Sequence, residues 1–168
     1  QRLISFGYDN ILDGTVLTAA IDTVTSLYVS YYGISDLTGI EDFTALTILN
    51  CGANDLTSLD VSNNTALIEL NCGLNQLTSL DVSANTALTS LNCSDNQLTS
   101  LDVSNNTALY DLGVSHNQIT NLDLSNNTTL TELNCRSTQL TSIDLSNNTA
   151  LTVLNFSYNQ INSIDLSN

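Results

Sequence analysis

The chain of 168 residues carries 17 acidic side chains against two basic ones, Arg2 and Arg136, for a formal net charge of −15. This charge excludes nucleic acid as a partner and disfavours anionic membrane surfaces, because both present negative groups that would repel the protein. No apolar run approaches the roughly 18 residues that a membrane-spanning helix needs, so we expect no membrane insertion. A basic-then-apolar secretory leader is not visible in these residues either.

The first 23 residues differ in pattern from everything that follows. Leu3, Ile4 and Phe6 fit the end of a short helix that stops near Gly7. A solenoid needs a cap over its first hydrophobic coil. We therefore predict that residues 1–23 form an N-terminal cap.

From Val24 onward the sequence repeats with a period of 21 residues, as in the unit Leu88–Ala108, which reads LTSLNCSDNQLTSLDVSNNTA. In the first half of this unit, Leu91 and Cys93 alternate with polar residues. Such alternation predicts a short strand with one apolar face. Self-similarity at this period, with the pattern LxxLxLxxNxL, is typical of a solenoid in which each copy is one coil stacked on the last.

The second half of the unit repeats the pattern of the first. Its apolar and Asn positions Leu98, Leu101, Val103 and Asn106 stand at the same offsets as Leu88, Leu91, Cys93 and Asn96. Each coil is therefore predicted to hold two strand-like segments and two Asn-rich turns. Because no helical pattern lies on the outer side, we expect a weakly curved, right-handed superhelix with two parallel β-sheets.

The motif LxxLxLxxNxLxxLDLxxN, matched from Leu46 onward, resembles the bacterial 21-residue leucine-rich repeat class called IRREKO. The chain is also similar to flavobacterial secreted and surface leucine-rich repeat proteins, whose N-terminal cap residues 1–23 resemble. The resemblance implies a leucine-rich repeat fold in which Asn96 turns inward to bond the backbone of a tight turn. It also implies a secreted or cell-surface location.

The repeats are predicted to form one domain over residues 24–168, with about seven coils. The first coil is one residue longer than the rest, and the later coils begin at Leu46, Leu67, Leu88, Leu109, Leu130 and Leu151. The last coil is partial and leaves Leu154, Phe156 and Ile161 without a polar cap. We expect either that the chain belongs to a longer protein or that this end packs against a second copy as a homodimer, since open strand edges pair readily.

All four cysteines occupy the same inward offset in their coils, which Val29, Val114 and Phe156 fill in the others. The four are Cys51, Cys72, Cys93 and Cys135. A free cysteine behaves there as a small hydrophobic residue, so we predict structural core cysteines. A disulfide between neighbours in register and a metal site are the alternatives, and both are disfavoured because strand neighbours point in parallel.

The outward positions of the first strand and its following turn form columns across coils, which we call the first face. One column holds Asn50, Asn71, Asn92, Asn134 and Asn155, and is interrupted by Gly113. Stacked amides either bond to one another or bind a ligand such as a sugar. The departures from the repeat concentrate in two adjacent coils, where Gly113 is expected to open room. The candidate ligand-binding residues are Tyr110, Asp111, His116, Glu132 and Arg136.

Asp95, His116 and Ser137 share one offset in three successive coils and have the residue types of a hydrolase triad. Neighbours in such a column stand about 4.8 Å apart on an exposed face, beyond hydrogen-bond reach, with no oxyanion hole in view. We therefore predict no catalytic residues and no enzyme activity.

The second strand-like segment of each coil forms the second face, which is more regular. It carries a Thr column and a column of carboxylates at Asp60, Asp81, Asp102, Asp123, Asp144 and Asp165. Stacked carboxylates repel one another, which raises their pKa values unless partners compensate. Hydroxyl groups of Ser58, Ser79 and Ser100 are the expected partners, so no cofactor is predicted. Calcium bound along the Asp column is the alternative.

Three functions follow from these patterns. The first is a non-enzymatic binding module that holds a protein or a polysaccharide on its first face. The second is a structural spacer or adhesin stalk. The third, from the Thr and Asp columns of the second face, is an ice- or mineral-binding solenoid.

Overall fold

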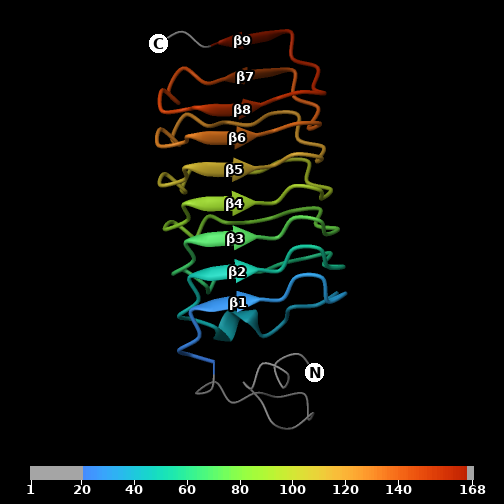
Figure 1. Cartoon of the computed structure of the whole chain (residues 1–168), viewed down its shortest axis with the longest axis vertical. Helices are drawn as coiled ribbons and strands as arrows, with labels where there is room; N and C mark the ends of the chain where they lie inside the picture. The colour runs from blue at the N-terminus through green and yellow to red at the C-terminus, as the bar shows by residue number, and fades with distance from the viewer. Residues whose placement is uncertain (1–20, 166–168) are drawn as a thin grey trace.

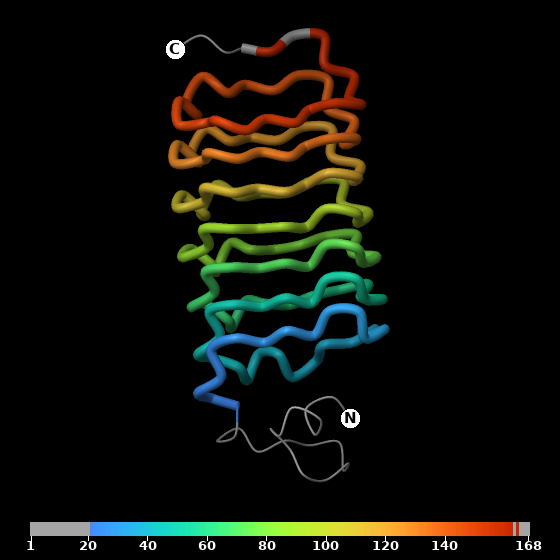
Figure 2. Tube along the Cα trace, viewed as in Figure 1, coloured from blue at the N-terminus to red at the C-terminus, as the bar shows by residue number. Residues whose placement is uncertain are grey.

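The computed structural model describes residues 21–165, without the side chains of Ser163 and Asp165. The coils stack along the long axis into a column with little curvature, and the chain climbs from one end to the other (Figures 1 and 2). The predicted β-solenoid of stacked parallel strands is confirmed. The predicted cap lies almost wholly outside the described residues and stays a prediction. Among the described residues, no helix is long and apolar enough to span a bilayer.

The first segment of each coil forms one strand of a seven-stranded parallel sheet, in the order β1-β2-β3-β4-β5-β6-β8. Its strands are β1 (Ser26–Tyr28), β2 (Ile48–Asn50), β3 (Glu69–Asn71), β4 (Ser90–Asn92), β5 (Asp111–Gly113), β6 (Glu132–Asn134) and β8 (Val153–Asn155). Residues one repeat apart pair side by side on adjacent strands, as Leu70 pairs with Leu91. Positions one period apart in the sequence are therefore neighbours in space throughout this sheet.

The first coil is longer than the others because it contains the short 3-10 helix η2 (Ile40–Asp42). The helix starts after Gly39, whose φ of 99° is easily adopted only by glycine. Phe43 follows the helix and is buried. The main-chain oxygens of Ile40 and Phe43 accept hydrogen bonds from the amide of Asn64 in the next coil, at 2.8 and 3.1 Å.

The four cysteines lie inside the stack, fully buried and with free thiols. Val114 interrupts their column between Cys93 and Cys135. Burial raises the pKa of the Cys51 and Cys93 thiols to about 12 and that of Cys135 to about 11. Since the thiolate is the reactive form, these side chains act as packing groups and not as nucleophiles.

A ladder of inward asparagines joins successive coils at the first turn. Asn96 donates from Nδ2 to the main-chain oxygens of Cys72 in the preceding coil and Cys93 in its own, both at 3.1 Å. Its Oδ1 accepts from the N–H of Leu77 in the preceding coil at 2.9 Å. Asn75 and Asn117 repeat these bonds. One buried amide thus satisfies backbone groups in two coils at once.

Replacing Asn96 with alanine is expected to lower the free energy of unfolding by about 1–3 kcal/mol, because it leaves the N–H of Leu77 unsatisfied in the core. It also removes one of the two amide donors to the main-chain oxygens of Cys72 and Cys93, which keep those of Asn75 and Asn117. Asn96→Thr should cost clearly less. Thr138 stands in the same column, and its hydroxyl still donates to the main-chain oxygen of Cys135 at 2.8 Å. Urea unfolding followed by circular dichroism measures both variants. Equal losses would contradict this role for the amide.

A second column of buried asparagines lies at the second turn: Asn64, Asn85, Asn106, Asn127 and Asn148. Asn106 donates from Nδ2 to the main-chain oxygens of Val82 and Asn85, at 3.0 and 2.9 Å. Within the described residues, the Oδ1 atoms of this column accept no hydrogen bond. This column therefore links each coil to the one before it through its N–H donors alone. Buried oxygens without a partner occur more often in proteins than buried N–H groups without one.

The second sheet is much smaller than predicted. In the described residues it has two strands, β7 (Ser142–Asp144) and β9 (Ser163–Asp165). In the earlier coils, side chains bond the backbone at both ends of this segment, as Asn117 Oδ1 does with Leu98 N–H and Asp102 Oδ1 with Ser104 N–H. The equivalent bonds, to Leu140 N–H and Ser146 N–H, are also present around β7, so they do not account for the missing strands. What distinguishes the β7 coil in the described residues is the positive φ of Gln139, 82°, just before the strand.

Candidate binding face

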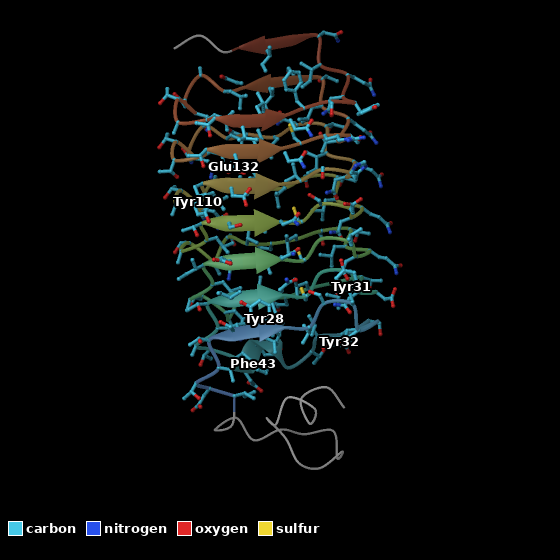
Figure 3. All side chains as sticks on the ribbon, viewed as in Figure 1. Tyr28, Tyr31, Tyr32, Phe43, Tyr110 and Glu132 are labelled. Atoms are coloured by element: carbon cyan, nitrogen blue, oxygen red, sulfur yellow. The ribbon has the colours of Figure 1, made fainter. Side chains whose placement is uncertain are left out.

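The five candidate residues lie on or beside β5 and β6 but do not converge on one site. Tyr110 precedes β5 at the edge where the strands begin, whereas His116 and Arg136 lie in the turns after the strands end. Figure 3 shows Tyr110 and Glu132 toward the former edge and Tyr31 at the latter. The predicted cluster is therefore spread across the width of the sheet.

Contacts of the charged residues confirm this separation. Asp111 accepts a hydrogen bond from the hydroxyl of Ser90 at 3.1 Å and stands opposite Glu132 in register. The Arg136 guanidinium lies over the ring of Tyr158, 4.6 Å from its centroid. This cation–π contact turns the arginine toward the next coil and away from the two carboxylates.

Gly113 does not open room on the face, contrary to the expectation from sequence. A Cβ at this position would meet Asn92 Oδ1 at 3.0 Å and Ser94 Oγ at 3.2 Å. The space is already taken by side chains of the preceding coil. The glycine therefore permits close packing between β4 and β5.

The asparagine column does not form a ladder of amides bonded to one another. Each amide instead closes the turn that follows its own strand: Oδ1 of Asn71 accepts from the N–H of Gly73, and Oδ1 of Asn92 from the N–H of Ser94, both at 3.1 Å. Asn50 does the same with Gly52 at 3.3 Å. The Nδ2 groups of these three asparagines donate no hydrogen bond in the described structure. A row of spare amide donors therefore faces outward at strand spacing.

A hollow of about 340 Å³ lies beside this row, over the first four coils. Three kinds of residue line it: the amides Asn50, Asn71 and Asn92, the small residues Ser30, Gly52, Gly73 and Ser94, and the turn residues Tyr31, Ala53, Leu74 and Asp95. This groove was not predicted from the sequence, whose departures from the repeat favoured the coils of β5 and β6. The sequence feature that could have indicated the groove is the small residue two positions after each of the first four strands: Ser30, Gly52, Gly73 and Ser94.

The turn column that rims the hollow has a left-handed backbone throughout. Its members Tyr31, Ala53, Leu74, Asp95, His116, Ser137 and Tyr158 have φ between 53° and 62°. A residue with a Cβ pays roughly 1–2 kcal/mol in this conformation. The column that contains Asp95, His116 and Ser137 is therefore a structural turn position. No hydrogen bond joins these three side chains in the described structure.

Ala53→Gly is expected to raise the free energy of unfolding by about 0.5–1 kcal/mol, because glycine adopts the left-handed conformation without steric cost. Ala108→Gly is the matched control. Ala108 is exposed and has no positive φ, so the same change should lower stability by a similar amount. Urea unfolding of both variants checks the opposite signs. Stability changes of the same sign would contradict the assignment of strain to this turn.

The carboxylates of the second face are stabilised in their charged form. Backbone N–H groups of Ser62, Ser104 and Ser125 hold the pKa values of Asp60, Asp102 and Asp123 below the ordinary 3.8, with help from the serine hydroxyls. For Asp81 the hydroxyl of Ser83 is the larger cause. The predicted partners Ser58, Ser79 and Ser100 do not form these hydrogen bonds. The serine two residues after each Asp forms them instead.

No group of three or more His, Cys, Asp or Glu side chains in the described residues is placed to hold a metal ion. The carboxylates of the Asp column do not converge on one point, because each accepts a hydrogen bond from the N–H of the serine two residues later in its own coil. Asp165 belongs to the column by register, and its side chain is not among those described.

Because the folded pKa values of these aspartates are depressed, their contribution to stability is complete above pH 3.8 and is lost as the pH falls through the folded values. Asp81→Asn combined with Asp102→Asn should therefore reduce the fall in unfolding temperature between about pH 4 and pH 2. The control removes two exposed carboxylates that accept no hydrogen bond, Asp42→Asn and Asp95→Asn. It should leave that fall nearly unchanged, and an equal effect of both pairs would refute the assignment.

Three solved structures with the same architecture come from bacteria. An internalin, InlF, from Listeria monocytogenes is 27% identical over 90% of this chain, with a TM-score of 0.79. The Leptospira interrogans LRR protein LIC12759 is 25% identical over 88%, with a TM-score of 0.81. InlJ from L. monocytogenes, whose functional domain includes a cysteine ladder, is 37% identical over 90%, with a TM-score of 0.58. No protein-family model and no curated protein matches the sequence.

The stacked coils, the inward asparagines and these likenesses define a leucine-rich repeat protein. It is similar to the internalins and to the Leptospira protein. The chain spans 43% of InlJ, 50% of InlF and 40% of the Leptospira protein, so it corresponds to less than the whole of each.

Proposed function

We propose that the protein is a non-enzymatic binding module of a secreted or cell-surface bacterial protein, and that its first face holds the ligand. The observation that carries this proposal is the contrast between the two faces. The first is a continuous seven-stranded sheet whose side chains differ from coil to coil, with a hollow of about 340 Å³ beside it. The second is irregular in backbone and nearly uniform in side chains, and its hollow of about 250 Å³ lies among the repeated Asp and Ser residues.

A rigid sheet suits recognition, because little conformational freedom is lost when a ligand binds. The internalin-like and Leptospira neighbours support a recognition module of the leucine-rich repeat kind. The extracellular location follows from the resemblance to flavobacterial surface proteins and to the 21-residue repeat class. A cofactor has no part in this proposal, since the first face offers amides, hydroxyls and aromatic rings as its binding groups.

The spacer or stalk is the alternative, and it predicts that no face of the protein has a ligand. The ice-binding alternative is less favoured. It requires regular ranks of hydroxyls, and the Thr column lies on a face that has no strand ladder over its earlier coils in the described structure.

Two variants with equal added charge test the proposal on an array of bacterial and host surface proteins and glycans. The first-face variant combines Ser26→Lys, Ser90→Lys and Val153→Lys, which spread three long cations along the sheet. The second-face control combines Ser58→Lys, Ser100→Lys and Ser142→Lys, at exposed positions.

We expect the wild type and the second-face control to bind the same array components. The first-face variant should lose at least tenfold in affinity, because the lysines block close approach to the sheet and must be desolvated. Absence of any binding by the wild type would favour the spacer. Loss confined to the second-face control would place the ligand on the opposite face.

A further inference from the structure

We propose that the hollow along β1–β4 is a groove for an extended, neutral polysaccharide that runs parallel to the long axis of the solenoid. The inference rests on the proposed function and names the ligand class of the first face. It is carried by three features of the same groove, namely its donors, its floor and its rim.

The donors are the amides of Asn50, Asn71 and Asn92. Each Oδ1 is held by the N–H two residues on, at 3.1–3.3 Å, so each amide plane is fixed before any ligand arrives. The Nδ2 groups have no hydrogen-bond partner in the described structure, so each amide keeps two N–H donors unused. Fixed donors bind hydroxyl and ether oxygens without further loss of side-chain freedom.

The floor of the groove is kept low by glycines. Gly52 and Gly73 are buried, and a Cβ at either position would lie 3.2 or 3.1 Å from a main-chain oxygen of the next coil. Ser94, which follows in the same column, is also buried. The glycines let the amides pack closely over this floor, since a Cβ at Gly73 would also lie 3.4 Å from Asn71 Oδ1 and Asn92 Nδ2. A larger side chain would displace the amide row that lines the groove.

The rim carries apolar side chains where the backbone favours glycine or asparagine. Tyr31 is 80% exposed with φ 62°, and Leu74 is 54% exposed with φ 55°. An exposed bulky residue gains little from packing here and still bears the cost of the left-handed conformation. The left-handed φ belongs to the turn in every coil, and what the groove adds is that the side chains carried there are large, apolar and exposed. The aromatic face of tyrosine suits the C–H face of a sugar ring.

Charge and spacing select the ligand class. The donors are uncharged, the groove ends at Asp95, and the chain carries a net charge of −15, so an anionic ligand would be repelled. Amides repeat along the axis at about 4.8 Å. An extended peptide presents carbonyls to one side about every 6.8 Å and falls out of step after one coil. Pyranose rings in an extended β-1,4 chain advance by roughly one strand spacing, and because successive rings are turned over, equivalent hydroxyls recur at every second amide.

Calorimetry and amide NMR shifts with cellotetraose, chitotetraose and mannotetraose test the proposal, with tetragalacturonate as the anionic control. We expect at least one neutral tetrasaccharide to bind the wild-type chain. The largest shifts should fall on Asn50, Asn71, Asn92 and their turns. Tetragalacturonate should bind at least tenfold more weakly than that sugar.

Asn71→Asp is the decisive variant, because it keeps an oxygen for the N–H of Gly73 and removes the two N–H donors, while the charge it adds is matched in the control below. We expect it to weaken binding at least tenfold, and Tyr31→Ala to do likewise. Asn134→Asp is the matched control. That amide also accepts from its own turn, at 3.3 Å from Arg136 N, but lies outside the groove. It should change affinity less than twofold.

The proposal is overturned if no neutral tetrasaccharide binds at millimolar concentration, or if Asn134→Asp weakens binding as much as Asn71→Asp does. It is also overturned if the anionic control binds best. If the array instead identifies a protein ligand whose binding is abolished by the first-face lysine variant, the proposed function stands and only the glycan is ruled out. Thermal unfolding of each variant shows whether a loss of binding reflects a loss of fold.

Discussion

The architecture depends on one interaction, the inward asparagine that bonds the backbone of two coils. Asn96 supplies donors to carbonyls of its own and the preceding coil, and an acceptor to an N–H of the preceding coil. Shifting one coil against the next by a single residue would break all these bonds and turn the apolar positions outward. Hydrophobic burial drives the stacking, and the apolar pattern and the asparagine amides together specify its register.

The same logic explains why the two faces differ. On the first face, the strand ladder and the asparagine ladder act together, and the sheet is continuous from β1 to β8. On the second face, the Asp102-type carboxylates take backbone N–H groups for their own turns, and the Asn106-type amides donate without accepting. Side chains therefore take a larger part in bonding the backbone there. The continuous strand ladder belongs to the first face, which suits that face to hold a ligand.

The period of 21 residues allowed the solenoid and the columns to be predicted, because parallel pairing one coil apart converts sequence offset directly into spatial order. The period says nothing about backbone dihedrals. Asp102 and Asp144 share the motif LDxS or IDxS, yet only Asp144 lies in a strand, after the altered turn at Gln139. Likewise, Leu74 and His116 look like free surface positions in the sequence. Their left-handed turn emerges only once the strand has ended and the chain must reverse.

This turn column bears directly on how such a protein acquires a binding site. Because ladder bonds fix the coil before and after each turn, the backbone stays left-handed whatever side chain it carries, and residues as different as Tyr31, Asp95 and Ser137 occupy it. The side chains most free to vary are thus held at the most constrained points of the backbone, at the edge of a groove floored by glycine. A ligand running along the axis meets one such side chain per coil, beside one spare amide donor. Specificity is then set by which side chain each coil presents there, while the asparagine ladder keeps their spacing constant.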